Sequence, residues 1–287
     1  MLIRSDSHVH TRFSIDGKDH IYKIVERAID LGVKYIIITD HLEYDNNKFS
    51  LDFNNYFIKI LECKEKYKAK INIFAGVEVG YQSHIKDEID NVVNSYPFDF
   101  VLCSTHTIDN KAVSKNEYFE KLTQREAYTK YFESIIKTVK EFKNLDIYGH
   151  LDYVRRYGDY RKNKYIYEDY KDVLDEVLKE ILYAGKGIEI NTSGFRYKVD
   201  SFHPKIEVLK RYKEIGGELI TIGSDAHRST DLCRDFDKVH DILKYLGFEY
   251  ICVYEERKPK FLKIEENTSQ VDKNVIKAQG ETFINII

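Results

Sequence analysis

The chain has 287 residues, enough for one large α/β barrel or for two ordinary domains. Charged residues make up 32% of it, and no apolar run approaches the roughly 20 residues that span a bilayer, so a membrane protein is not expected. Its 45 basic and 48 acidic residues leave a net charge of −3, which argues against nucleic acid as a partner.

The four cysteines lie far apart and form no CxxC pair, so the sequence predicts neither a disulfide framework nor a thiolate zinc site. The first residues, MLIRSDSHVH, contain no basic segment followed by a long apolar one, and a leader is therefore not expected. We predict a cytoplasmic protein that is a monomer or a small homo-oligomer.

Short β-branched runs alternate with segments of helical periodicity along the chain. Because the strands read as continuous apolar runs between helices, they predict a parallel sheet that helices cover. We expect one α/β domain over residues 1–265 and a polar C-terminal extension over residues 266–287. The clearest helical repeats fall at residues 21–29, 128–139 and 172–183. The predicted strands lie at residues 2–7, 34–39, 72–78, 98–104, 146–150, 187–191 and 218–224, with an eighth candidate at 250–254.

Polar residues of the types that bind metals lie at the ends of these strands. They occur in SDSHVH, ITDH, GVEVG, CSTH, YGH, EIN and GSDAH. In a parallel α/β barrel the C-terminal ends of all strands meet at one rim, where the active sites of such barrels lie. We therefore expect one group of side chains to converge there: His8, His10, His41, Glu78, His106, His150, Asp225 and His227.

Each of these residues also has a simpler explanation. A single histidine after a strand is more often a hydrogen-bonded loop residue than a metal ligand, and an isolated acidic residue can cap a helix or stabilise a turn. The joint pattern favours a metal site, because six of the ten histidines fall at predicted strand ends. The simpler explanation is kept for the other four, His20, His84, His203 and His240.

Two further aspartates, Asp6 and Asp40, lie within or beside the strands that carry His8 and His41. Either they accept the second ring N–H of those imidazoles, or they make buried hydrogen bonds at the strand ends. A cluster of imidazoles and carboxylates without thiolate suits Zn, Mn or Fe, and the ligand types do not choose among these metals.

In this order, the motifs DSHVHTRFSID, ITDH, GVEVG, STH, GHLD and GSDAH resemble the polymerase and histidinol phosphatase (PHP) superfamily over nearly the whole chain. More narrowly, GHLDYVRRYGDY and EINTSGFRYK resemble its histidinol-phosphatase branch. The resemblance implies a distorted (β/α)7 barrel, similar to a TIM barrel, and a cluster of two or three divalent metal ions.

The resemblance also implies which residues bind each metal. Glu78 would bridge the first two ions, and some family members have histidine at the position of Asp16. The first metal would take His8, His10, Glu78 and Asp225, the second Glu78, His106 and His150, and the third Asp16, His41 and His227.

The activity implied by the resemblance is hydrolysis of L-histidinol phosphate to L-histidinol and phosphate, a step of histidine biosynthesis. Cations held close together make hydroxide available near neutral pH and clamp phosphoryl oxygens, which favours attack on a phosphate monoester. The leaving alkoxide needs a proton, and Asp225, His227 and Asp16 are the candidate donors.

Arginines near the fifth and sixth strands are candidates to hold the substrate phosphate, because a guanidinium binds phosphate through two hydrogen bonds. Arg196 and Arg156 match the histidinol-phosphatase pattern, and Arg161 lies in the same loop as Arg156.

Two alternatives stay open. The same metal site could act on a phosphotyrosine protein or on a nucleotide or sugar phosphate. The barrel could also bind metal without catalysis, although such copies usually lack several ligands and this chain keeps every one.

Overall fold

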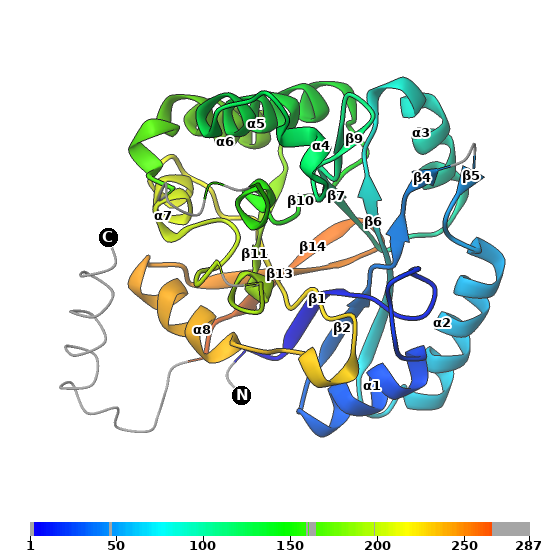
Figure 1. Ribbon diagram of the computed structural model, residues 1–287. Helices are drawn as coiled ribbons and strands as arrows, with labels where there is room; N and C mark the ends of the chain where they lie inside the picture. The colour runs from blue at the N-terminus through cyan, green and yellow to red at the C-terminus, as the bar shows by residue number, and fades with distance from the viewer. Residues whose placement is uncertain (1–2, 46–47, 159, 161–164, 198, 266–287) are drawn as a thin grey trace.

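A computed structural model describes residues 3–45, 48–158, 160, 165–197 and 199–265. The predicted extension at residues 266–287, and Arg161, therefore lie outside the described residues. The strands occupy the centre of the molecule and the helices surround them (Figure 1). None of the helices in the described ranges is long and apolar enough to cross a membrane.

The main sheet is parallel and follows the predicted strands in chain order. The first strand spans Ser5–Val9, whereas its prediction was residues 2–7. It ends later than predicted because it continues through polar residues to Val9. His8 therefore lies inside this strand, and His10 directly follows it. The sheet consists of β1 (Ser5–Val9), β2 (Tyr35–Ile38), β6 (Asn72–Gly80), β7 (Phe100–Ser104), β10 (Ile147–Tyr148), β11 (Gly187–Asn191) and β12 (Ile220–Gly223), with β3 (His41–Leu42) also paired to β6.

The two ends of this strand order, β1 and β12, meet and nearly close the sheet. Val9 and Ala226 form an isolated parallel bridge. The His10 amide donates to the Ala226 carbonyl at 2.9 Å, and the Asp225 amide donates to the His8 carbonyl at 2.8 Å. The expected distorted (β/α)7 barrel is thus confirmed, and residues of the candidate site lie along its seam.

Helices form where the apolar periodicity predicts them. The three clearest repeats become α1 (Ile21–Asp30), α5 (Gln124–Glu141) and α6 (Lys171–Tyr183). Thr123 and Glu126 form a capping box that fixes the start of α5. The remaining helices are α2 (Phe53–Tyr67), α3 (Lys86–Ser95), α4 (Asn116–Phe119), α7 (Ile206–Glu214) and α8 (Phe236–Tyr245), with 3₁₀ turns η1 (Ser83–Ile85), η2 (Tyr153–Arg156), η3 (Tyr167–Asp169), η4 (Thr192–Phe195) and η5 (Ser229–Asp231).

The eighth candidate strand exists but does not join the parallel sheet. It is β13 (Tyr250–Glu255), which pairs antiparallel with β14 (Lys258–Lys263). Its Cys252 and Tyr254 pack against barrel residues such as Phe100, so the hairpin covers the N-terminal end of the barrel. Two short hairpins, β4 (Tyr44–Asp45) with β5 (Lys48–Phe49) and β8 (Thr107–Ile108) with β9 (Lys111–Ala112), follow other strands.

Strand alternation divides the barrel interior into an apolar lower part and a polar upper part. Phe74 and Glu78 of β6 lie four residues apart and therefore point to the same side. Phe74 packs with Phe100 and Ile147 toward the N-terminal ends of the strands. Glu78 lies at the other end, where it accepts a hydrogen bond from Ser104 at 2.7 Å. The polar end is where the candidate site forms.

Candidate metal centre

Glu78 lies at the centre of the site, with imidazoles facing both of its carboxylate oxygens. Oε1 is 2.9 Å from His150 Nε2 and 3.4 Å from His106 Nε2. Oε2 is 2.9 Å from His41 Nδ1, because the β3–β6 register places His41 directly opposite Glu78. The His8 Nε2 atom completes this side at 3.3 Å from Oε2. Glu78 is only 1% exposed, so these contacts form away from solvent.

His8 and His10 point into one space, as the alternation of a strand predicts. Their Nε2 atoms are 3.0 Å apart. Asp225 reaches them across the barrel seam, with Oδ1 at 3.8 Å from His8 Nε2 and 3.6 Å from His10 Nε2. One ligand atom from each of these three residues lies within 4.8 Å of the others, a spacing that can hold one metal ion.

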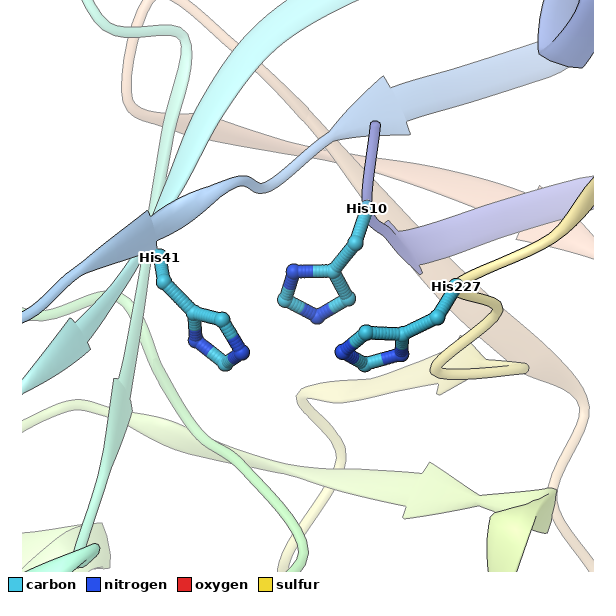
Figure 2. A group of neighbouring side chains, drawn as sticks. All are labelled: His10, His41 and His227. Carbon is cyan, nitrogen blue, oxygen red and sulfur yellow. The ribbon is translucent and has the colours of Figure 1, made fainter. Parts of the chain in front are cut away.

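A second face of the site is built from His10, His41 and His227, whose rings approach one another from three different strand ends (Figure 2). The ring centroids of His10 and His227 are 4.1 Å apart. Asp16 joins them from the rim, with Oδ2 at 3.2 Å from His227 Nε2 and Oδ1 at 3.6 Å from His41 Nε2. Asp16 is 52% exposed, which makes it the most accessible acidic group of the site.

Two carboxylates of the site were not identified from the sequence. Glu43, two residues after His41, lies 2.5 Å from His106 Nδ1. A Cβ at Gly80 would stand 2.2 Å from the Glu43 carboxylate, which explains the second glycine of GVEVG.

The other unidentified carboxylate is Glu189 in β11, whose Oε1 is 2.7 Å from His8 Nδ1 and whose Oε2 accepts the His150 amide at 2.8 Å. A Cβ at Gly223 would stand 2.0 Å from Glu189 Oε1, so the glycine of GSDAH leaves room for this carboxylate. The sequence does contain a signal for Glu189, namely a charged residue inside the apolar strand GIEIN. Such a residue is buried, and a buried charge needs a partner.

Asp6 and Asp40 do not contact the imidazoles for which they were considered. Asp6 accepts the Ser224 amide at 2.9 Å and the Cys233 amide at 3.1 Å. Asp6 also accepts the His8 amide at 3.4 Å, so its contact with His8 is through the backbone and not through the ring. Asp40 accepts from Thr11 and Ser14. Both aspartates therefore make the buried strand-end hydrogen bonds of the alternative interpretation.

Burial and opposite charge act against each other on the titration of these groups. Burial alone would raise the pKa of Glu78, but the imidazoles of His8, His106 and His41 hold it well below its usual value. Burial alone would lower the pKa of His106, but Glu43 and Glu78 raise it to about 9. The carboxylates thus favour protonated, positively charged imidazoles beside them. A divalent cation bound to the same imidazole nitrogens would supply that positive charge in place of the protons.

The residues present fit a metal ion. Glu78 Oε2 and His41 Nδ1 are both buried and have no hydrogen-bond partner in the described part of the chain, although they lie 2.9 Å apart. Buried polar atoms without partners are costly, and a cation bound at either atom removes that cost. The donors are imidazole nitrogens and carboxylate oxygens, a set that suits zinc and other first-row metals.

Comparison with known proteins agrees with this geometry. The profile of the PHP domain matches residues 6–193. This chain belongs to the PHP domain family. The resemblance that its motifs carry is therefore confirmed.

Relatives of this PHP chain include histidinol-phosphatases. That of Lactococcus lactis is 31% identical over 270 residues, which cover 93% of this chain and 98% of that protein. The "Probable histidinol-phosphatase" of Clostridium acetobutylicum is 33% identical over 238 residues, covering 80% and 89%. A crystal structure of histidinol phosphate phosphatase from L. lactis, complexed with zinc, L-histidinol and phosphate, matches with a TM-score of 0.83 at 32% identity, over 90% of this chain and 98% of that one.

Two arginines of the PHP chain lie against Asp225. Arg156 donates from Nη2 to Asp225 Oδ2 at 3.2 Å and to the Ser193 hydroxyl. Arg196 donates from Nη2 to the carbonyls of Ser224 at 2.6 Å and Asp225 at 2.8 Å, while its buried Nη1 has no partner among the described residues. Arg155 turns away and pairs with Asp152 at 2.7 Å.

Proposed function

We propose that this chain is a metal-dependent phosphomonoesterase that hydrolyses L-histidinol phosphate to L-histidinol and phosphate. The observation that carries the proposal is the set of imidazoles and carboxylates around Glu78 with arginine N–H groups beside it. The histidinol-phosphatases among its relatives, and the structure with zinc, L-histidinol and phosphate, favour this substrate over other phosphate esters.

Two or three divalent ions would be held by the residues that converge on Glu78. When bound, such ions supply a Lewis acid that lowers the pKa of water and neutralises phosphoryl charge. His8, His10, Glu78 and Asp225 would form one site, and His106 and His150 with Glu78 a second. Asp16, His41 and His227 would form a third at the rim. Glu43 and Glu189 would orient the His106 and His8 rings through their Nδ1 atoms.

The chain's own side chains would bind the substrate and move the proton. Arg156 and Nη1 of Arg196, which has no partner in the described ranges, would hold the phosphate. Arg161 is proposed for the same role from its position in the sequence. Asp225 is already bound by Arg156 and Ser193, so it is a poor proton donor. The accessible Asp16–His227 pair is the better candidate to protonate the leaving alkoxide when only the first two ions are bound, because a residue that holds the third ion has no proton to give.

The test measures phosphate release from L-histidinol phosphate beside sugar phosphates, phosphotyrosine and nucleotides, with metal content determined on the same sample. We expect the highest kcat/KM for histidinol phosphate. Equal turnover across the panel would contradict the assigned substrate and leave a general phosphoesterase. Bound metal without turnover of any substrate would instead support a non-catalytic barrel.

A further inference from the structure

His203, to which the sequence pattern gives no role, lies in a buried chain of polar contacts that ends at Arg156. His203 and Asp152 are both 0% exposed. The His203 ring contacts Asp152 Oδ1 through Nδ1, and its Nε2 is 3.1 Å from Arg156 Nε. Arg156 in turn donates to Asp225 Oδ2 at 3.2 Å. These contacts thus link the buried Asp152 carboxylate to the edge of the metal centre.

The backbone fixes His203 independently of its side chain. Its amide donates to the Asn191 carbonyl at 2.9 Å, and the Asn191 amide donates back at 2.8 Å, which attaches His203 to the end of β11. Arg156 belongs to η2, a different element. The His203–Arg156 hydrogen bond therefore sets the position of the arginine relative to the barrel.

The hydrogen-bond partners of Asp152 and His203 determine which atoms in this series of contacts carry the protons. Asp152 also accepts from Arg155 at 2.7 Å and from the Lys205 amide at 2.9 Å, so it stays an acceptor. Burial lowers the pKa of His203 to about 4, and the ring is therefore neutral at ordinary pH. A neutral ring has one N–H, which Nδ1 donates to Asp152. Nε2 is left with a lone pair, and the Arg156 Nε–H donates to it.

The aromatic neighbours of Arg156 hold its plane but not its direction within that plane. The guanidinium lies over the rings of Tyr153 at 4.8 Å and Tyr197 at 4.5 Å. Stacking on a ring face tolerates rotation and sliding within the plane, whereas an N–H bond to a fixed acceptor does not. The bond from Nε to His203 therefore acts together with the Nη2 bonds to Ser193 and Asp225 to set where the Nη atoms point.

We propose that His203 and Asp152 are positioning residues, which fix the in-plane orientation of Arg156 and so set the affinity of the site for the substrate phosphate. The inference rests on the proposed function, since it uses Arg156 as a phosphate ligand. His203 acts on the substrate only through the arginine. Asp152 acts one step further away, by holding the ring in the tautomer that leaves Nε2 free to accept.

The variant His203→Asn separates the two contacts of the ring. Its amide lies where Nδ1 does and continues to donate to Asp152, but it does not extend to Arg156 Nε. We expect KM for histidinol phosphate to rise about tenfold with a smaller change in kcat, and His203→Gln, whose amide oxygen extends to the position of Nε2, to restore most of the affinity. His240→Asn is the matched control, because His240 is also buried but bonds the Glu265 carbonyl at 2.9 Å.

A double-mutant cycle shows whether the effect passes through Arg156. In an Arg156→Ala background, His203→Asn is expected to lower kcat/KM by less than about twofold. The same loss in both backgrounds would overturn the inference, since it would show a general structural effect.

A measurement independent of activity separates this inference from the proposed function. The Arg156 Nε–H, because it is hydrogen-bonded to His203, is expected to give a protected proton resonance in nitrogen-resolved NMR spectra, identified by its absence in Arg156→Ala. We expect that signal to be lost in His203→Asn and kept in His203→Gln and His240→Asn. Its persistence in His203→Asn would refute the positioning role. Absence of phosphate release by the wild-type protein would refute the proposed function, and the NMR result would still decide the contact.

Discussion

Glu78 shows how one residue can join several ligands. Its two oxygens face imidazoles on opposite sides, at 2.9 Å from His150 and 2.9 Å from His41. Glu78→Gln replaces one of these acceptors with an NH₂ group that points at imidazole lone pairs. We expect metal content and activity to fall together, with kcat/KM lower by at least about 100-fold. Even substitution of residues that only orient the metal ligands lowers metal affinity or activity by about 10–100-fold. Elemental analysis and phosphate release on one sample make the test, with exposed Glu88→Gln as control.

Arg196 is proposed to bind the substrate phosphate and not a metal ion, so its substitution is expected to separate substrate binding from metal retention. Its Nη2 already bonds two carbonyls, while Nη1 has no partner among the described residues and is the atom proposed to bind a phosphate oxygen. Arg196→Ala is expected to keep the metal content of wild type and to raise KM about tenfold, because a hydrogen bond to a charged group contributes about 1.5–3 kcal/mol. Wild-type kinetics in this variant would mean that the phosphate binds elsewhere.

At the scale of elements, the sequence predicts what depends on local periodicity. The helices at residues 21–29, 128–139 and 172–183 appear as α1, α5 and α6. A 3.6-residue apolar repeat places the apolar side chains on one face of the helix, and that face packs against the core. The site's convergence was also predictable, because parallel strands share one rim.

Features that depend on distant partners could not be predicted in the same way. The role of β13 is set by β14 and by the barrel floor, and the contact of Asp6 with Ser224 joins residues 218 positions apart. Glu189 had a local signal, a charge in an apolar strand, but its partner His8 lies 181 positions away. Pairings across such separations follow from barrel closure, which no local pattern encodes.

Besides the packing of Cys252 and Tyr254, the turn of the β13–β14 hairpin is attached to the barrel floor by hydrogen bonds. Arg257 donates from Nε to Asp146 Oδ2 at 2.6 Å and from Nη2 to Oδ1 at 3.0 Å, while the Glu256 amide donates to Asp99 at 3.1 Å. Arg257→Ala leaves the buried Asp146 carboxylate without its guanidinium. We expect unfolding free energy to fall by about 2 kcal/mol in urea titration, with kcat/KM unchanged. Exposed Arg234→Ala serves as control; a loss of activity in Arg257→Ala would show that the floor and the metal centre are coupled.

Across the whole molecule, three of the candidate metal ligands, His8, His10 and Asp225, lie where the barrel is least continuous. The strand order ends at β1 and β12, and the isolated bridge Val9–Ala226 joins β1 to the segment that follows β12, beside backbone bonds of His10 and Asp225. His8 and His10 come from one side of this seam and Asp225 from the other. A metal held by these three residues would therefore cross-link the two ends of the sheet, and its binding energy would add to the stability of the closed barrel.

Removal of metal is thus expected to destabilise the entire barrel as well as to abolish activity. A ligand at about 1,000 times its Kd stabilises the folded state by about 4 kcal/mol, and about 1 kcal/mol shifts Tm by about 2–4 °C in a domain of this size class. We expect a chelator to lower Tm by about 10 °C in calorimetry and re-addition of zinc or manganese to restore it. Glu78→Gln should show little difference in Tm with and without chelator, because it lacks the carboxylate proposed to bridge the ions. An unchanged Tm in wild-type protein whose metal content has fallen would show that the seam closes without the ion.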